Sequence, residues 1–240
     1  MCVLTYIPTE NNGFILTSNR DEAVSREPAI PPRKYHLHGQ NVFFPKDPKG
    51  GGTWIASCGN FTLCLLNGGF EKHIPQPPYR QSRGKVILDF YEYQNVNEFV
   101  NQYLFDGIEP FTLIIIENIG DLIIHELRWD AHKIFVTPID ATQSHIWSSA
   151  TLYSPKIRLQ REQWFRDFLV ERPNRDSILD FHHFGGKEDI RNGIKMNRDN
   201  KLQTISITQF VIDNDEFVIS YHDLQIDNKF QYRIFRELVS

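Results

Sequence analysis

Residues 2–18, CVLTYIPTENNGFILTS, contain two short apolar runs joined by a polar turn. Cys2 to Ile7 and Phe14 to Ser18 are rich in β-branched and aromatic residues, which favour strands. The Asn-Asn-Gly at 11–13 is typical of a hairpin turn. The sequence therefore predicts an antiparallel strand pair whose first strand begins almost at the amino terminus.

The rest of the chain continues with strands and is interrupted twice by paired helices. A second hairpin is expected over 53–66, turning at Gly59-Asn60, and apolar residues spaced by three and four predict two helices within 81–104, separated near Asn95. The proline-rich stretch 23–50 predicts an ordered surface loop. Further strands are expected at 111–116, 122–127, 132–136, 145–149, 203–212, 216–221 and 229–235, and further helices at 156–170 and from Asn174 or Asp176 to 185.

This order of elements favours an α+β architecture. Hairpins dominate and the helices come in pairs, which suits antiparallel sheets with helix pairs on their outer faces better than parallel βαβ winding. No break in composition follows the proline-rich stretch. We therefore expect a single domain over residues 1–240.

Composition excludes several classes of protein. A hydrophobic content of 40%, with 13% aromatic residues, is enough to build a core and argues against disorder. A net charge of −4 predicts neither nucleic acid nor an anionic membrane as a partner. Three cysteines are too few for a disulfide framework and favour a reducing compartment. With no run long enough for a transmembrane segment and no signal-peptide pattern at the start, we expect a cytoplasmic protein; its oligomeric state stays open.

Cys2 is the first candidate for chemistry. A small residue behind Met1 permits removal of the methionine, which would place a thiol and a free α-amine on one residue. The amine, with an ordinary pKa of about 7.7–8, can act as the local base for a thiol of ordinary pKa about 8.5. The alternative is that Cys2 is only a small apolar strand residue, as we expect for Cys58 and Cys64.

The second candidate is Asn19-Arg20-Asp21-Glu22, at the end of the strand predicted to pair with the one that starts at Cys2. An arginine beside a thiol favours the thiolate, and a carboxylate can hold the α-amine. Arg20 and Asp21 are adjacent and would face opposite sides of a regular strand, so both reach Cys2 only if the strand bulges or turns. The alternative is a charged turn with a surface Arg–Asp pair.

Together these segments resemble the NRDE family, also called the transport and Golgi organisation 2 family. Met1-Cys2, Asn19 to Glu22, Gly51-Gly52-Thr53-Trp54 and Leu66-Asn67 follow the order and spacing of that family, and 148–155, SSATLYSP, is similar to its SNALL…TP stretch. The family is similar in turn to N-terminal-nucleophile hydrolases of the choloylglycine hydrolase and penicillin V acylase type. The resemblance therefore implies a four-layer αββα sandwich of antiparallel sheets.

The resemblance also implies roles for individual residues. Cys2 would be the nucleophile that cleaves a linear amide of a small-molecule substrate after removal of Met1, with Arg20 and Asp21 as its polar partners. Asn67 would offer its amide to an oxyanion, and Ser149 would stand where the hydrolases carry an asparagine. The substrate-binding residues would be Asn19, Trp54 and Gly68. No metal and no cofactor is expected for this reaction.

Two departures from the family pattern favour an alternative function. Ser149 is shorter than the asparagine it replaces, and near the C-terminus only Lys201 stands where the hydrolases carry an arginine. The alternative is a non-catalytic, haem- or lipid-related binding or trafficking protein that keeps the hydrolase-like cleft. Elsewhere, His182-His183 are expected to be solvated or capping residues, and the run from Arg158 to Arg166 to be a solvated helix face.

Overall fold

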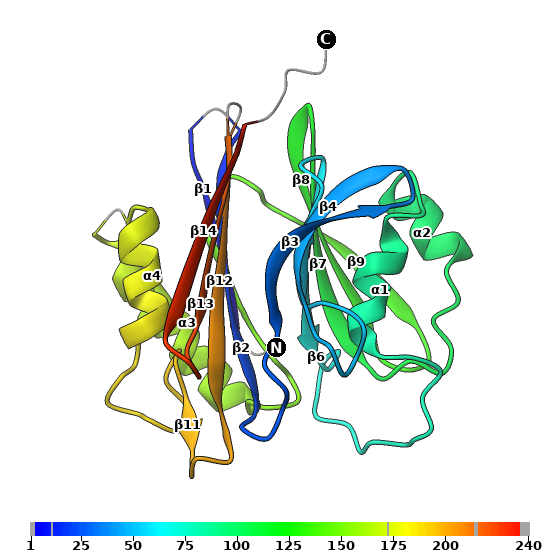
Figure 1. Cartoon of the computed structure of the whole chain (residues 1–240). Coiled ribbons are helices and arrows are strands. Elements are labelled where there is room, and N and C mark those ends of the chain that lie inside the picture. The colour runs from blue at the N-terminus through cyan, green and yellow to red at the C-terminus, as the bar shows by residue number, and fades with distance from the viewer. Residues whose placement is uncertain (1–2, 11, 172, 214–215, 236–240) are drawn as a thin grey trace. The chain divides into compact units, whose positions relative to one another are not determined.

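The computed structural model describes residues 3–10, 12–171, 173–213 and 216–235 (Figure 1). Its described residues divide into two compact units. Unit 1 comprises segments 1–26, 142–148 and 153–240, and unit 2 comprises 27–141 and 149–152. Because the chain passes from one unit to the other at four points, no single cut separates them in sequence. The expectation of one domain over 1–240 remains a prediction.

Unit 1 is a seven-stranded antiparallel sheet with two helices on one face (Figure 1). The strands run in the order β10-β1-β2-β12-β13-β14, and β11 pairs with β12. They are β1 (Val3–Pro8), β2 (Phe14–Ala23), β10 (His145–Ser148), β11 (Asn197–Arg198), β12 (Leu202–Ile212), β13 (Glu216–Asp223) and β14 (Asn228–Phe235); the helices are α3 (Pro155–Leu169) and α4 (Arg175–Phe184). A buried cluster joins sheet and helices: Val3, Ile7, Ile15, Phe165, Ile178, Phe181 and Ile194.

The predicted amino-terminal hairpin is confirmed. Strands β1 and β2 pair antiparallel, with Val3 opposite Asn19 and Thr5 opposite Thr17. The amide of Thr9 donates to the carbonyl of Gly13 at 2.9 Å where the two strands are joined. Residue 19 therefore lies beside the start of the first strand, as expected.

Unit 2 is also a seven-stranded antiparallel sheet with a helix pair on one face (Figure 1). Its strands follow sequence order: β3 (Ile30–Leu37), β4 (Gln40–Lys46), β5 (Ile55–Ser57), β6 (Phe61–Asn67), β7 (Phe111–Ile119), β8 (Asp121–Trp129) and β9 (Ile134–Ile139). The helices are α1 (Arg83–Phe90) and α2 (Val96–Gln102). As predicted, the helices separate at Asn95, whose side-chain oxygen accepts from the amide of Glu98 at 2.9 Å and caps α2.

The prediction of a surface loop over 23–50 is wrong. Residues 30–37 and 40–46 form the hairpin β3–β4. Strand β3 is an edge strand, where Pro31 and Pro32 do not remove hydrogen bonds that the sheet needs, and the register shifts between Ile30 and Arg33 around them. The turn His38-Gly39 has positive φ at both residues, 46° and 80°, as a two-residue hairpin turn requires.

The glycines before Trp54 serve packing in unit 2. A β-carbon on Gly52 would lie 2.2 Å from the carbonyl carbon of Gly84, in the first turn of α1, so only glycine permits this backbone approach. The amide of Thr53 donates to the carbonyl of Gly84 at 3.0 Å, and its hydroxyl donates to the carbonyl of Pro45 at 2.6 Å. The segment thus fixes α1 against its sheet.

No helix in the part of the chain that the structure describes has the length and apolar character needed to cross a membrane.

Candidate functional site

The predicted site residues fall into two groups, one in each unit, and each group is described within its own unit. Asn19, Arg20 and Asp21 belong to unit 1. Trp54, Asn67, Gly68 and Ser149 belong to unit 2. Cys2 lies outside the described residues.

The strand that starts directly after Cys2 lies between two others. Val3 pairs with Asn19 on β2 and with Ser148 on β10. Side chains alternate along a strand, so Asn19 and Asp21 share the face of the sheet that α4 covers, and Arg20 faces the other way. The expected opposition of Arg20 and Asp21 is therefore present. The local irregularity is on β12, where the register shifts between Thr204, opposite Asp21, and Ser206, opposite Arg20.

Asn19 is fully buried, and its side chain ties β2 to α4. Its nitrogen donates to the carbonyls of His182 at 3.0 Å and Ile194 at 2.9 Å, and its oxygen accepts from Nδ1 of His182 at 2.7 Å. These contacts use both amide hydrogens and one acceptor. They are contacts within the protein, whereas Asn19 was expected to bind substrate.

His182 is the link between α4 and the first strand. Because Nδ1 donates to Asn19, Nε2 is the acceptor and receives the hydroxyl hydrogen of Thr5 at 2.8 Å. Burial, together with the nearby charges of His183 and Arg161, lowers the pKa of His182 to about 3, so the ring is neutral at pH 7. The expectation of a solvated or capping histidine is wrong at this position. His182 fixes the strand on which Val3 follows Cys2.

Asp21 is buried and held by two hydroxyl groups. Tyr153 donates to one carboxylate oxygen at 2.7 Å, and Thr204 donates to the other at 2.6 Å. Thr204 is itself fixed by the amide of Met196, which donates to its hydroxyl oxygen at 2.9 Å. The carboxylate therefore has a set orientation in unit 1.

The buried guanidinium of Arg161 packs against the ring of Tyr153, the residue that donates to Asp21. The guanidinium of Arg161 lies 3.6 Å from the ring centroid of Tyr153, and that of Arg198 lies 5.1 Å away. Arg161 is 0% exposed and donates to the carbonyls of Asn192 at 2.9 Å and Gly193 at 2.5 Å. The expectation that the whole run 158–166 is solvated is therefore wrong at residue 161, because a set of fixed carbonyls and an aromatic face replace water around this cation.

Arg20 brings a buried positive charge to the other face of the sheet. It is 3% exposed. Burial raises the pKa of Tyr221 to about 12, and the nearby Arg20 guanidinium opposes this rise. Unit 1 thus separates an arginine on one face from a carboxylate on the other.

In unit 2, Asn67 ends β6 and is half-buried. Its carbonyl accepts from the hydroxyl of Ser149 at 2.8 Å and from the amide of Thr151 at 3.4 Å. Gly68 has φ of +87°, and its amide donates to the carbonyl of Pro110 at 3.0 Å. A hydroxyl carries one hydrogen, so Ser149 in this geometry fixes the backbone of Asn67 and does not donate elsewhere. Trp54 is 4% exposed, and its backbone carbonyl accepts from Leu65.

Sequence reasoning missed the residues that hold the predicted ones: Tyr153, Arg161, His182 and Thr204. A signal existed for two of them, because Arg161 lies four residues before the buried Phe165 and His182 four after the buried Ile178, each on the buried stripe of its helix.

Lys201, the one cation expected where the hydrolases carry an arginine, is exposed and precedes β12. Within the described residues, no three His, Cys, Asp or Glu side chains are grouped so that they could hold a metal ion.

The comparisons with known proteins agree with the motif pattern. The family model described as Transport and Golgi organisation 2 matches residues 1–222. Among curated proteins, no sequence matches the chain. Penicillin V acylase from Agrobacterium tumefaciens is similar in structure, with a TM-score of 0.55 and 12% identity over 98% of this chain and 86% of that one. This likeness confirms the predicted fold class, an α+β chain with the two antiparallel sheets and few helices of an N-terminal-nucleophile hydrolase. The chain belongs to the Transport and Golgi organisation 2 family.

Proposed function

We propose that this protein is an N-terminal cysteine amidohydrolase that cleaves a linear amide of a small molecule. After removal of Met1, the α-amine of Cys2 takes the thiol proton and the sulfur attacks the amide carbonyl carbon. The tetrahedral intermediate expels the amine, which leaves with that proton, and a thioester remains on Cys2. Water then hydrolyses the thioester, giving a carboxylic acid and the restored thiol.

The observation that carries this proposal is the register of the first hairpin. Val3 pairs with Asn19, so the segment Asn19-Arg20-Asp21 runs beside the strand that follows Cys2. Because Arg20 and Asp21 lie on opposite faces of the sheet, we give them different partners on Cys2: the buried arginine would favour the thiolate, and the fixed carboxylate would hold the backbone α-amine. The likeness in fold to a protein named as an acylase supports the same reaction class.

Asn67 is our proposed oxyanion donor. Its backbone is fixed by Ser149 and Thr151, and the amide of Gly68 is already used by Pro110, so the donor would be the side-chain amide of Asn67. A positioned donor of this kind contributes about 10²–10³ in rate. Ser149 would then act through Asn67 as a positioning residue, and Trp54 and Gly68 would shape the substrate-binding surface.

Hydrolysis of a panel of linear N-acyl amides tests the proposal, with released amine as the readout. We expect turnover by the wild-type protein with Met1 removed, loss of turnover in Cys2→Ala, and retained turnover in Cys58→Ala, the same change at a half-buried cysteine. Equal turnover by Cys2→Ala and wild type would overturn the proposal, as would an inactive wild type whose amino terminus is shown to be Cys2.

A second candidate function is non-catalytic binding of haem or a lipid. The observation that favours it is the hydroxyl of Ser149, which donates to the Asn67 carbonyl and not to a position where an oxyanion would form. Haem titration separates the two candidates. A Soret shift that is lost in Cys2→Ala supports thiolate ligation, whereas no shift together with amide hydrolysis rejects this candidate.

A further inference from the structure

Unit 1 contains a pocket of 430 Å³ that the proposed reaction does not use. It lies between α4 and the strands β12, β13 and β14, and all its lining residues belong to unit 1. The volume is within the range that small-molecule sites occupy.

The pocket follows from how α4 covers the sheet. Ile178, Phe181 and His182 form the stripe of α4 that is buried. Asp180 and His183 lie on the neighbouring stripe, one helical turn apart, and line the pocket. The sheet extends past β12 with β13 and β14, so this second stripe of α4 meets strands that the helix does not cover fully.

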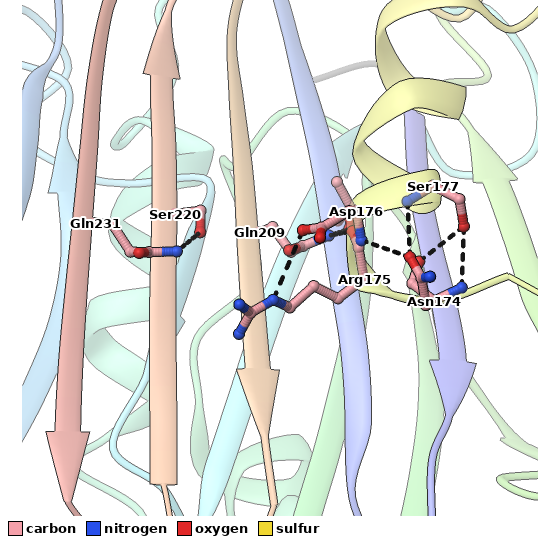
Figure 2. A network of polar contacts seen from close by, with 8 residues as sticks. Asn174, Arg175, Asp176, Ser177, Gln209, Ser220 and Gln231 are labelled. Carbon is pink, nitrogen blue, oxygen red and sulfur yellow. Dashed lines mark hydrogen bonds and ion pairs between the residues drawn. The ribbon is translucent and has the colours of Figure 1, made fainter.

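The strands contribute polar side chains in register. Ile207 on β12 pairs with His222 on β13, which pairs with Lys229 on β14. In the next row on this face, Ser220 pairs with Gln231, whose side-chain amide donates to the serine hydroxyl at 3.3 Å (Figure 2). Figure 2 also shows Gln209 of β12 beside the first turn of α4, where its side-chain amide donates to the carbonyl of Arg175 at 3.0 Å; the N-cap residue of α4 and Ser177 fix this turn by reciprocal bonds.

The pocket carries both signs of charge on separate elements. Asp180 comes from the helix and Lys229 from the edge strand. Neither makes a hydrogen bond or an ion pair with another side chain within the residues that the structure describes. Asp176, the other acid of the lining, already lies 3.7 Å from Arg175. Lys229 also interacts electrostatically with the exposed Asp227 carboxylate, but no ion pair joins the two within the described residues, so one carboxylate and one ammonium are left for a ligand.

Two histidines, His183 and His222, line the region between these charges. Nε2 of His222 lies 2.8 Å from the Asp227 carboxylate and therefore donates to it. The Nδ1 atom of His222 lies 3.4 Å from Nε2 of His183. Burial, followed by electrostatic interaction with His222, Lys195 and Lys229, lowers the pKa of His183 to about 4, so its ring is neutral at pH 7.

We propose that this pocket binds a small zwitterion of the amino-acid class. The ammonium group of the ligand would meet Asp180 and its carboxylate would meet Lys229. Its aliphatic part would lie on Leu179 and Ile207, which line the same pocket. A singly charged amine or carboxylate would use one of the two charges and leave the other without a partner, so it would bind more weakly. This inference does not depend on the proposed reaction.

Isothermal titration calorimetry of the full chain tests it. The probes are a series of ω-amino acids from glycine to 6-aminohexanoate and L-leucine, with pentylamine and pentanoate as singly charged counterparts of 5-aminopentanoate. We expect at least one zwitterion to saturate the protein with a dissociation constant of about 1 mM or below. Because the charges are near the surface, Asp180→Asn and Lys229→Gln should each weaken binding by about fivefold.

The matched controls are Asp167→Asn and Lys187→Gln, exposed changes of the same kind in unit 1 that do not line the pocket. They should bind like wild type, and so should Cys2→Ala, which separates this site from the proposed reaction. A series in which no zwitterion saturates the protein overturns the inference. Equal affinity for pentylamine and 5-aminopentanoate, or full affinity in folded Asp180→Asn and Lys229→Gln, overturns it as well.

Discussion

The neutral, buried His182 makes the stability of the protein depend on pH in a defined window. The folded state holds the ring neutral because burial lowers its pKa to about 3 from an ordinary value of 6.5. Between these values the unfolded chain binds a proton that the folded chain does not, so stability falls as the pH falls from 6.5 towards 3. Each pH unit below 6.5 costs about 1.4 kcal/mol, so we expect His182 by itself to contribute a loss of about 2 kcal/mol between pH 7 and pH 5.

Urea unfolding of wild type and His182→Gln at pH 7, 6 and 5 measures this effect. The variant removes the titrating ring and disturbs its bonds to Thr5 and Asn19, so it should be less stable at pH 7 by about 1–3 kcal/mol. Its loss between pH 7 and pH 5 should be smaller than that of wild type by about 2 kcal/mol. His36→Gln, at an exposed histidine, should keep the wild-type pH dependence. An equal loss in wild type and His182→Gln would refute the reasoning.

Three further substitutions test the contacts around the proposed site. Tyr153→Phe removes one of two hydroxyl donors to the buried carboxylate of Asp21 and should lower the free energy of unfolding by about 1.5–3 kcal/mol in urea; unchanged stability would show that the bond is absent. Gly52→Ala would place a methyl carbon 2.2 Å from backbone, so we expect a loss above about 2 kcal/mol by thermal melting, and a wild-type melting temperature would contradict that close approach. Ser149→Ala leaves the carbonyl of Asn67 with one of its two donors and should cost about 1 kcal/mol, with Ser149→Thr as the control that keeps a hydroxyl; equal melting of the two variants would count against the bond.

Local patterns were sufficient where a single hairpin or helix decides the structure. The pairing of Val3 with Asn19 follows from two apolar runs and a short turn, and the break at Asn95 follows from a residue type that caps helices. The hairpin over 30–46 was missed because Pro31 and Pro32 are tolerated only at a sheet edge, and a strand's place in the sheet is not a local property.

The residues that hold the candidate site could not be found by type alone. Arg161 and His182 are polar residues on buried helix stripes. Arg161 contacts the ring of Tyr153, eight positions away, and the backbone carbonyls and side chains that the two residues bond lie more than 20 positions away in sequence. The bond from Ser149 to Asn67 spans 82 residues and depends on the packing of unit 2. Motif spacing identifies candidate residues, whereas these long-range contacts decide which hydrogens and charges are still available to a substrate.

The most direct test of the proposed nucleophile is the intact mass of the native protein before and after brief reaction with iodoacetamide at neutral pH, followed by peptide mapping. We predict the mass of the chain without Met1 and one carbamidomethyl group, located on Cys2, while Cys58 and Cys64 remain unmodified. A retained Met1, or alkylation of Cys58 at the same rate as Cys2, would contradict the claim that Cys2 is an activated amino-terminal nucleophile.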